Sequence, residues 1–178
     1  MKHFSPSLIS IFAVALFLGA CAQRRTVPFE EAAFVPYAGS GSGTVVGTAF
    51  LRISKDNTIT AGESKSVVKL MPANAYTDEI VTKHYQTNLK IEPADPRFRK
   101  YVRRATPDDA GRFAFHHIPP GVYYVSCDLV WSTPSTYTDS NGAILASTDT
   151  MTHWIYKRIS VGNGRTVQVE DWDNGFSP

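Results

Sequence analysis

Residues 108–131, DDAGRFAFHHIPPGVYYVSCDLVW, restrict the fold of this chain more than any other stretch. Side chains of opposite character alternate on both sides of Pro119-Pro120-Gly121, and a period of two is typical of a strand. Glycine after the prolines supplies the backbone angle of a tight turn. The alternation puts Phe113, Phe115 and His117 on one face of the first run, and in the second run it separates Tyr123, Val125, Cys127, Leu129 and Trp131 from Tyr124, Ser126 and Asp128. The stretch therefore predicts two strands joined by a tight connection.

The rest of the chain adds short strands and one helix. Strand-like patterns occupy 44–54, 67–72, about 100–106 and 151–171, the last as a hairpin with Asn163-Gly164 at its turn. Residues 76–86 differ, because apolar positions recur there with helical spacing and Asp78 and Glu79 stand where a helix start favours acids. Seven short strands with a short helical insert predict an all-β sandwich.

Two motifs in these strands resemble the carboxypeptidase regulatory-like family. They are Gly111-Arg112-Phe113 and the run from Ile118 to Tyr123, and residues 43–47 and 67–70 fit the first two strands of that family. The resemblance implies a transthyretin-like (prealbumin-like) Greek-key sandwich, here over residues 44–172, with 173–178 as a C-terminal tail. The chain differs from the family pattern in residues 74–98 and 132–150. The resemblance implies a binding, bracing or display module more than a reaction.

The first 20 residues have the pattern of an export signal. A short basic start precedes an apolar run from 8 to 18, which is too short to span a bilayer. Leu18-Gly19-Ala20-Cys21 resembles the lipobox of bacterial lipoproteins, which implies that the signal helix of residues 1–20 is removed and that Cys21 carries the lipid. Ala22 then favours sorting to the outer membrane of the cell envelope. The alternative is an ordinary signal cut near Cys21, which leaves a free thiol.

Residues 21–43 lie between the lipid and the sandwich. Prolines and a Gly/Ser run interrupt regular structure there, so this segment is predicted to be a flexible tether of about 25 Å. The alternative is that Phe29, Phe34 and Tyr37 dock on the sandwich.

Composition and motifs give little support for catalysis. The chain has 18 Lys and Arg against 16 Asp and Glu, which offers no argument for a nucleic-acid partner. With Cys21 lipidated, Cys127 has no thiol to pair with and is expected to be a buried, inert thiol. His116 and His117 are adjacent and point to opposite faces of a strand, which argues against a shared metal ion. Asp108-Asp109 fits a turn. We expect no cofactor, no metal and no enzymatic activity.

Two features are candidates for binding. The first is the basic stretch 97–104, with Arg99 and Arg103, although a solvated face paired with nearby acids explains it better. The second is the hydroxyl-rich loop 132–150 with Trp131, Tyr137 and Trp154, although a plain hairpin with Asn141-Gly142 as its turn also fits. The sequence thus predicts a non-enzymatic, lipid-anchored envelope protein that binds or braces a protein partner in a surface or secretion assembly, with a sheet edge available to a partner strand. The alternative is a carbohydrate- or cell-wall-binding module that uses the 132–150 loop.

Overall fold

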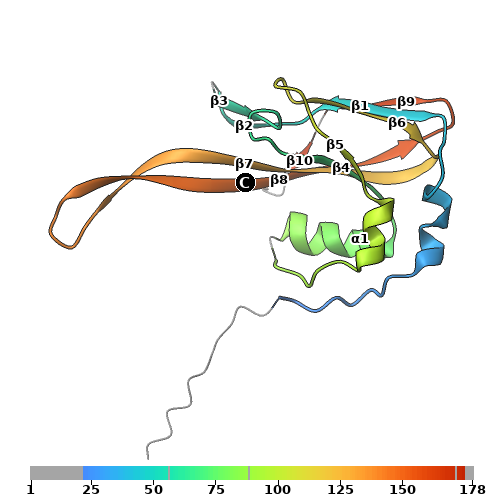
Figure 1. Ribbon diagram of the computed structural model, residues 1–178, viewed down its shortest axis with the longest axis horizontal. Helices are drawn as coiled ribbons and strands as arrows, with labels where there is room; N and C mark the ends of the chain where they lie inside the picture. Colours follow the sequence, from blue (N-terminus) through green and yellow to red (C-terminus); the bar gives the residue numbers. More distant parts are fainter. Residues whose placement is uncertain (1–21, 56, 88, 171, 175–178) are drawn as a thin grey trace, which may run out of the picture.

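The computed structural model describes residues 22–55, 57–87, 89–170 and 172–174. The predicted signal peptide, Cys21 and the last four residues lie outside these ranges. Within them the protein has three layers, with a three-stranded sheet on one side, a five-stranded sheet in the middle and a helical layer on the other side (Figure 1). None of the helices in these ranges has the length and apolar character that crossing a bilayer requires.

The two sheets form the predicted all-β sandwich. The smaller sheet has the order β6-β1-β9, with β1 antiparallel to β6 and parallel to β9. The larger sheet has the order β10-β8-β7-β4-β5, and β2 and β3 form a separate hairpin. The strands are β1 (Gly43–Thr48), β2 (Phe50–Ser54), β3 (Asn57–Thr60), β4 (Val68–Pro72), β5 (Arg103–Ala105), β6 (Arg112–Ile118), β7 (Gly121–Thr138), β8 (Ile144–Val161), β9 (Thr166–Val169) and β10 (Asp173–Asn174).

The described residues thus contain ten strands where seven were predicted. The pattern at 44–54 divides at Ala49, because β1 belongs to the sandwich whereas β2 leaves it to pair with β3. Asp173–Asn174, predicted as part of a tail, adds a short edge strand beside β8. The transthyretin-like Greek-key topology stays a prediction.

The strand predicted around 100–106 begins later than expected. Residues Pro96–Tyr101 form a 3-10 helix, η4, and only Arg103–Ala105 pair with β4. Asp95 caps this helix by accepting a hydrogen bond from the backbone of Arg97, and Pro96 at the first helical position fits a helix start.

The space between the sheets holds the main core. The alternation predicted for 122–131 is confirmed, because Tyr123, Val125, Cys127 and Leu129 are all buried on this face. Cys127 is fully buried and free, as predicted. Desolvation, followed by the nearby Asp128 charge, raises the pKa of its thiol to about 12. A thiol in that state is a poor nucleophile at neutral pH.

The alternation predicted for β6 fails at its end. Phe113 and Phe115 are buried as expected, but His117 is exposed and Ile118 takes the buried position. The register to β1 shifts between Gly43 and Val45, and His117 has a φ of 58°. This is a β-bulge, which moves the following side chain to the other face of the strand.

The helical layer covers the opposite face of the five-stranded sheet. The predicted helix is present as α1 (Ala75–Ile80), which continues into a π-helical turn, η3 (Val81–Gln86). Asn74 starts α1 with a capping box, in which its side chain and that of Thr77 each accept a backbone hydrogen bond. A second apolar cluster fills the interface with the sheet; it comprises Phe34, Met71, Tyr76, Val81, Tyr85, Phe98, Tyr101 and Tyr124. Because both faces of β7 are covered, its body section is buried almost continuously.

Residues 23–37 pack on the body instead of forming a flexible tether. Phe34 is fully buried in the second cluster, where its ring stacks on Phe29 with centroids 5.0 Å apart. Tyr37 packs edge-on against Tyr123. Backbone hydrogen bonds from Gln23 to Lys90 (2.7 Å) and from Glu92 to Gln23 (3.0 Å) fix the start of the segment. Two short 3-10 helices, η1 (Glu31–Ala33) and η2 (Val35–Tyr37), complete it. The structure therefore shows the alternative in which this segment docks on the body, because its aromatic side chains pack into apolar contacts there.

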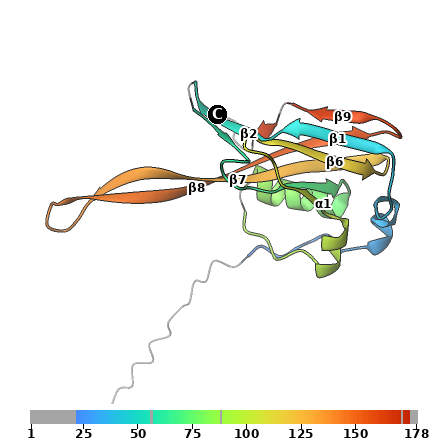
Figure 2. The same ribbon diagram turned by 45° about the horizontal axis from the view of Figure 1, so that its top comes forward.

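The hairpin of β7 and β8 extends well beyond the body (Figures 1 and 2). The two strands stay in register from Gly121 opposite Val161 to Thr138 opposite Ile144. We call residues 130–152 the arm. Its turn is closed by Asp139, which accepts hydrogen bonds from the backbone of Asn141 and Ala143. Residues 132–150 thus form the plain hairpin that the sequence left as an alternative, with Asn141-Gly142 in its turn.

Candidate functional site

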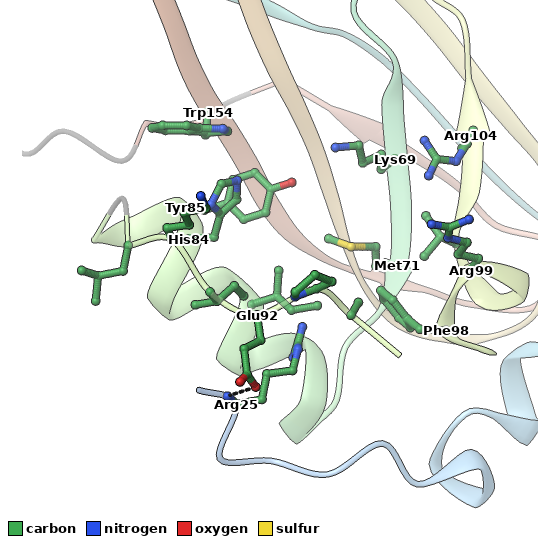
Figure 3. Close-up of a pocket in the computed structure, with 17 residues that line it drawn as sticks. Arg25, Lys69, Met71, His84, Tyr85, Glu92, Phe98, Arg99, Arg104 and Trp154 are labelled. Atoms are coloured by element: carbon green, nitrogen blue, oxygen red, sulfur yellow. Dashed lines mark hydrogen bonds between the residues drawn. The ribbon is translucent and has the colours of Figure 1, made fainter. Parts of the chain in front are cut away.

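A pocket of about 580 Å³ lies between the helical layer and the edge of the five-stranded sheet. One wall comes from β4, β5 and η4, and the other from η3 and β8 (Figure 3). The connection 89–94 and Arg25 of the docked N-terminal segment form the remaining side. The fold therefore brings five stretches of the chain to one cavity, namely residue 25, residues 69–71, 80–94 and 98–104, and residue 154.

One wall of the pocket is cationic. Lys69 of β4 lies directly opposite Arg104 of β5, and Arg99 of η4 lies beside them (Figure 3). Like charges at opposite positions of a strand pair are destabilising. Lys69 is compensated by Asp128, to which its ammonium group donates a hydrogen bond of 2.5 Å. In the part of the chain that the structure describes, the guanidinium groups of Arg99 and Arg104 have no such partner. Both side chains are exposed, so their guanidinium groups are accessible to an anion in the pocket.

The other wall is aromatic. Trp154 of β8 is half-buried and meets the ring of His84 edge-on, with centroids 5.0 Å apart. Behind them, Tyr85 is buried and donates a hydrogen bond to Ser126. Burial, with the Asp128 charge, raises the pKa of Tyr85, so that this hydroxyl stays neutral and serves to hold the wall. Trp154 remains as a flat apolar surface opposite the guanidinium groups.

The remaining side of the pocket is electrically balanced. The backbone N–H of Arg25 donates to Glu92 (Figure 3), which is the one carboxylate among the described lining residues. The Arg25 guanidinium lies 3.6 Å from Glu79 and 4.3 Å above the ring of Tyr76. Lys90 adds a further positive charge at the rim. The pocket as a whole is therefore positive.

Only two of the predicted site residues meet in this pocket. Arg99 and Trp154 line it, although they were predicted as parts of different features. Arg103 points elsewhere and donates to the carbonyl oxygen of Gly39. Trp131 lies on the other face of the β7–β8 ribbon and packs against the main core, and Tyr137 is 55% exposed far out on the arm.

The basic stretch 97–104 divides in the same way. Arg97 forms an ion pair with Asp95 at 2.9 Å, and Lys100 pairs with Glu31. These two cations are neutralised on the surface, as the solvated-face interpretation expected. Arg99 and Arg104 are the members of the stretch that line the pocket.

Sequence reasoning missed Lys69, His84 and Tyr85 as pocket residues. One signal existed, since Lys69 is the single charge in the apolar run VVKLMP. No group of three or more His, Cys, Asp or Glu side chains in the described ranges is placed to hold a metal ion.

Comparison with known proteins finds a similarity to a solved structure. No protein family matches the chain by sequence, and no curated protein does. The structure is similar to the crystal structure of a Pseudomonas aeruginosa protein for which carbohydrate binding has been suggested, with a TM-score of 0.64 and 27% sequence identity. The similar region covers 82% of this chain and 99% of that one, so the matched fold spans practically the whole of that protein.

Proposed function

We propose that this protein is a non-enzymatic binding protein whose pocket takes up an acidic saccharide. The observation that carries the proposal is the pairing of two unpartnered guanidinium groups, Arg99 and Arg104, with the ring of Trp154 across one cavity. The similarity to a protein suggested to bind carbohydrate supports the ligand class. The proposal moves the carbohydrate site from the 132–150 loop, where the sequence placed it, to the pocket.

The chemistry of the two walls matches two parts of an acidic sugar. A planar guanidinium group binds a carboxylate or sulfate through parallel N–H donors. The C–H face of a sugar ring is apolar and can cover an exposed tryptophan, as in other concave sites with an apolar wall and a few polar groups. About 580 Å³ is within the range of small-molecule pockets.

Calorimetric titration with a glucuronate-containing disaccharide tests the proposal, with the neutral disaccharide of the same linkage as a comparison. We expect binding of the acidic sugar and much weaker binding of the neutral one. Arg104→Gln and Arg99→Gln should each weaken binding roughly tenfold at low salt, because a hydrogen bond to a charged group contributes about 1.5–3 kcal/mol before screening. Trp154→Ala should weaken the acidic and the neutral sugar alike.

Arg52→Gln is the matched control. Arg52 is exposed on β2, outside the pocket lining, and its replacement removes the same charge. Its affinity should stay that of the unaltered protein. If Arg52→Gln and Arg104→Gln lost affinity equally, the loss would come from the change in net charge, and this result would contradict the proposed pocket.

The location of the protein belongs to the same proposal. We place it at the cell envelope, in the outer membrane, held by a lipid on Cys21. The lipobox-like sequence supports this placement. The protein partner in a surface or secretion assembly stays a prediction.

A further inference from the structure

The arm carries most of the exposed large apolar side chains among the described residues. Among the described residues, five of the eight large apolar side chains that are exposed lie on it; these are Val130, Tyr137, Ile144, Leu145 and Met151. Apolar side chains form cross-strand pairs at two heights along the arm, which we call the tip level and the base level. Tyr137 lies opposite Leu145 near the tip, and Trp131 lies opposite Met151 near the base, with both pairs on the same face. Contiguous exposed apolar side chains mark interaction sites, whereas isolated ones are ordinary.

Among the described residues, no strand pairs with the outer edge of β8 in the arm. Asp139 donates its backbone N–H to Ala143, so this pair is hydrogen-bonded. Hydrogen-bonded pairs alternate along an antiparallel ladder. Even-numbered residues of the arm, Thr148 among them, therefore turn their N–H and C=O groups outward. On β8, no strand of the described residues pairs with this row between Ile144 and Trp154, and β10 covers the edge from Ile155 onward.

The outer edge of β7 is blocked. Pro134 has no N–H and, by the same alternation, occupies an outward-facing position opposite Thr148. Proline at such a position prevents pairing with another strand. Residues 144–152 of β8 contain no proline, and the whole arm contains no Lys or Arg. The usual protection of an edge by lysine is therefore missing on β8.

The β8 edge is complementary to itself in one register. If Thr148 faces Thr148 of the partner subunit in antiparallel pairing, the outward-facing even residues meet each other, as the ladder requires. Asp149, the one charge of this edge, then lies opposite Ser147 of the partner subunit, so the two aspartates do not oppose each other. Leu145 lies opposite Met151 of the partner subunit. The apolar pair near the tip of one arm therefore lies beside the apolar pair near the base of the other arm.

This register joins the separate apolar pairs into continuous rows. Across the four strands, one row runs from Tyr137 through Leu145 to Met151 and Trp131 of the partner subunit, and symmetry repeats it. On the other face, Ile144 of one copy lies opposite Thr152 of the partner subunit. The partner's Thr152 in turn lies opposite Val130 of the partner subunit. Apolar and aromatic neighbours across strands stabilise a sheet. Antiparallel pairing of one edge with its own copy also satisfies twofold symmetry, the commonest symmetry of oligomers.

We propose that two copies of this protein associate through their arms, with the β8 edges pairing antiparallel about Thr148 to form a four-stranded sheet. This surface is independent of the pocket.

Cysteine cross-linking in the full-length chain tests the proposal. Thr148→Cys should form a disulfide-linked dimer under mild oxidation, because directly opposite residues of a hydrogen-bonded pair have Cα atoms about 5.5 Å apart, within reach of a disulfide. Thr152→Cys should not, because its counterpart would lie opposite Ile144. Thr136→Cys, on the blocked β7 edge at nearly the same height, should not either. Cys21 and Cys127 are unchanged in every variant, so any disulfide cross-linking through these natural cysteines is the same in all of them.

A second substitution tests the apolar rows. Leu145→Asp in the Thr148→Cys chain should reduce the dimer fraction roughly tenfold, the effect of about 1.4 kcal/mol. Ile53→Asp in the same chain is the control, because Ile53 is 43% exposed, close to the 39% of Leu145, but lies outside the arm. The proposal is overturned if Thr148→Cys stays monomeric or cross-links to a different protein, if Thr136→Cys cross-links equally, or if the two Asp variants behave alike.

Discussion

Glu79 is the polar centre of the contact between the N-terminal segment and the helical layer. Its carboxylate accepts hydrogen bonds from the backbone and hydroxyl of Thr26, both at 2.7 Å, and from Lys83 at 2.7 Å. Burial alone would raise the pKa of Glu79, but these hydrogen bonds outweigh it and lower the pKa to about 2. One side chain therefore links residues 25–27 to the start of the helical layer.

At the residue scale, we predict that Glu79→Gln destabilises the fold by roughly 3 kcal/mol at neutral pH, because it leaves the half-buried cations Arg25 and Lys83 without their charged partner. The folded pKa lies below the ordinary value of 4.5, so the contribution is complete above about pH 4.5 and is lost as the pH falls towards about 2. Thermal unfolding at a series of pH values measures this. The unaltered protein should lose more stability than the variant between pH 4.5 and 2. Glu30→Gln, at an exposed position of the same segment, should follow the unaltered protein.

At the element scale, the strands were predictable where one local pattern decides them. The two-residue alternation of β7 identifies both of its faces, and Pro119-Pro120-Gly121 identifies the turn before it. The bulge at His117 was not predictable, because it depends on where β6 pairs with β1. The docking of Phe34 depends on a cavity that forms only when β4, α1 and η4 come together. The pocket was missed for the same reason, since its cationic and aromatic walls come from segments far apart in the chain.

The arm depends on a tight turn that one glycine makes possible. Gly142 has a φ of 83°, and a Cβ there would meet nothing within 4 Å. We predict that Gly142→Ala strains this turn by about 1 kcal/mol, since a left-handed conformation is unfavourable for residues with a Cβ. Amide exchange in residues 139–143 should become roughly fivefold faster, with little change in the melting temperature of the sandwich. Gly39→Ala, where space is equally open and φ is not positive, should leave exchange in the arm unaltered. Unchanged exchange in Gly142→Ala would contradict a strained turn.

At the scale of the whole molecule, the folded body and the proposed lipid are separable. The described residues fold around two apolar clusters, and Cys21 lies outside the described residues. We predict that Cys21→Ser leaves the thermal unfolding of the body unchanged but releases the protein from membranes into the soluble fraction. Cys127→Ser is the control, since it changes a buried thiol and should leave membrane association intact. A Cys21→Ser protein that still sediments with membranes after a high-salt wash would show that lipid is not what holds it.

If Cys21 carries the proposed lipid, the docked N-terminal segment determines how near the bilayer the pocket lies. Gln23 is already fixed to Lys90 and Glu92 beside the cavity, and it comes two residues after Cys21. Two residues of extended chain reach only about 7 Å. With acyl chains on Cys21, the folded body would rest against the lipid headgroups, and the pocket would lie close to the membrane surface. A saccharide displayed on the same bilayer would then have to travel only sideways to reach Arg99 and Arg104, whereas a freely diffusing one would have to enter the narrow space between protein and lipid.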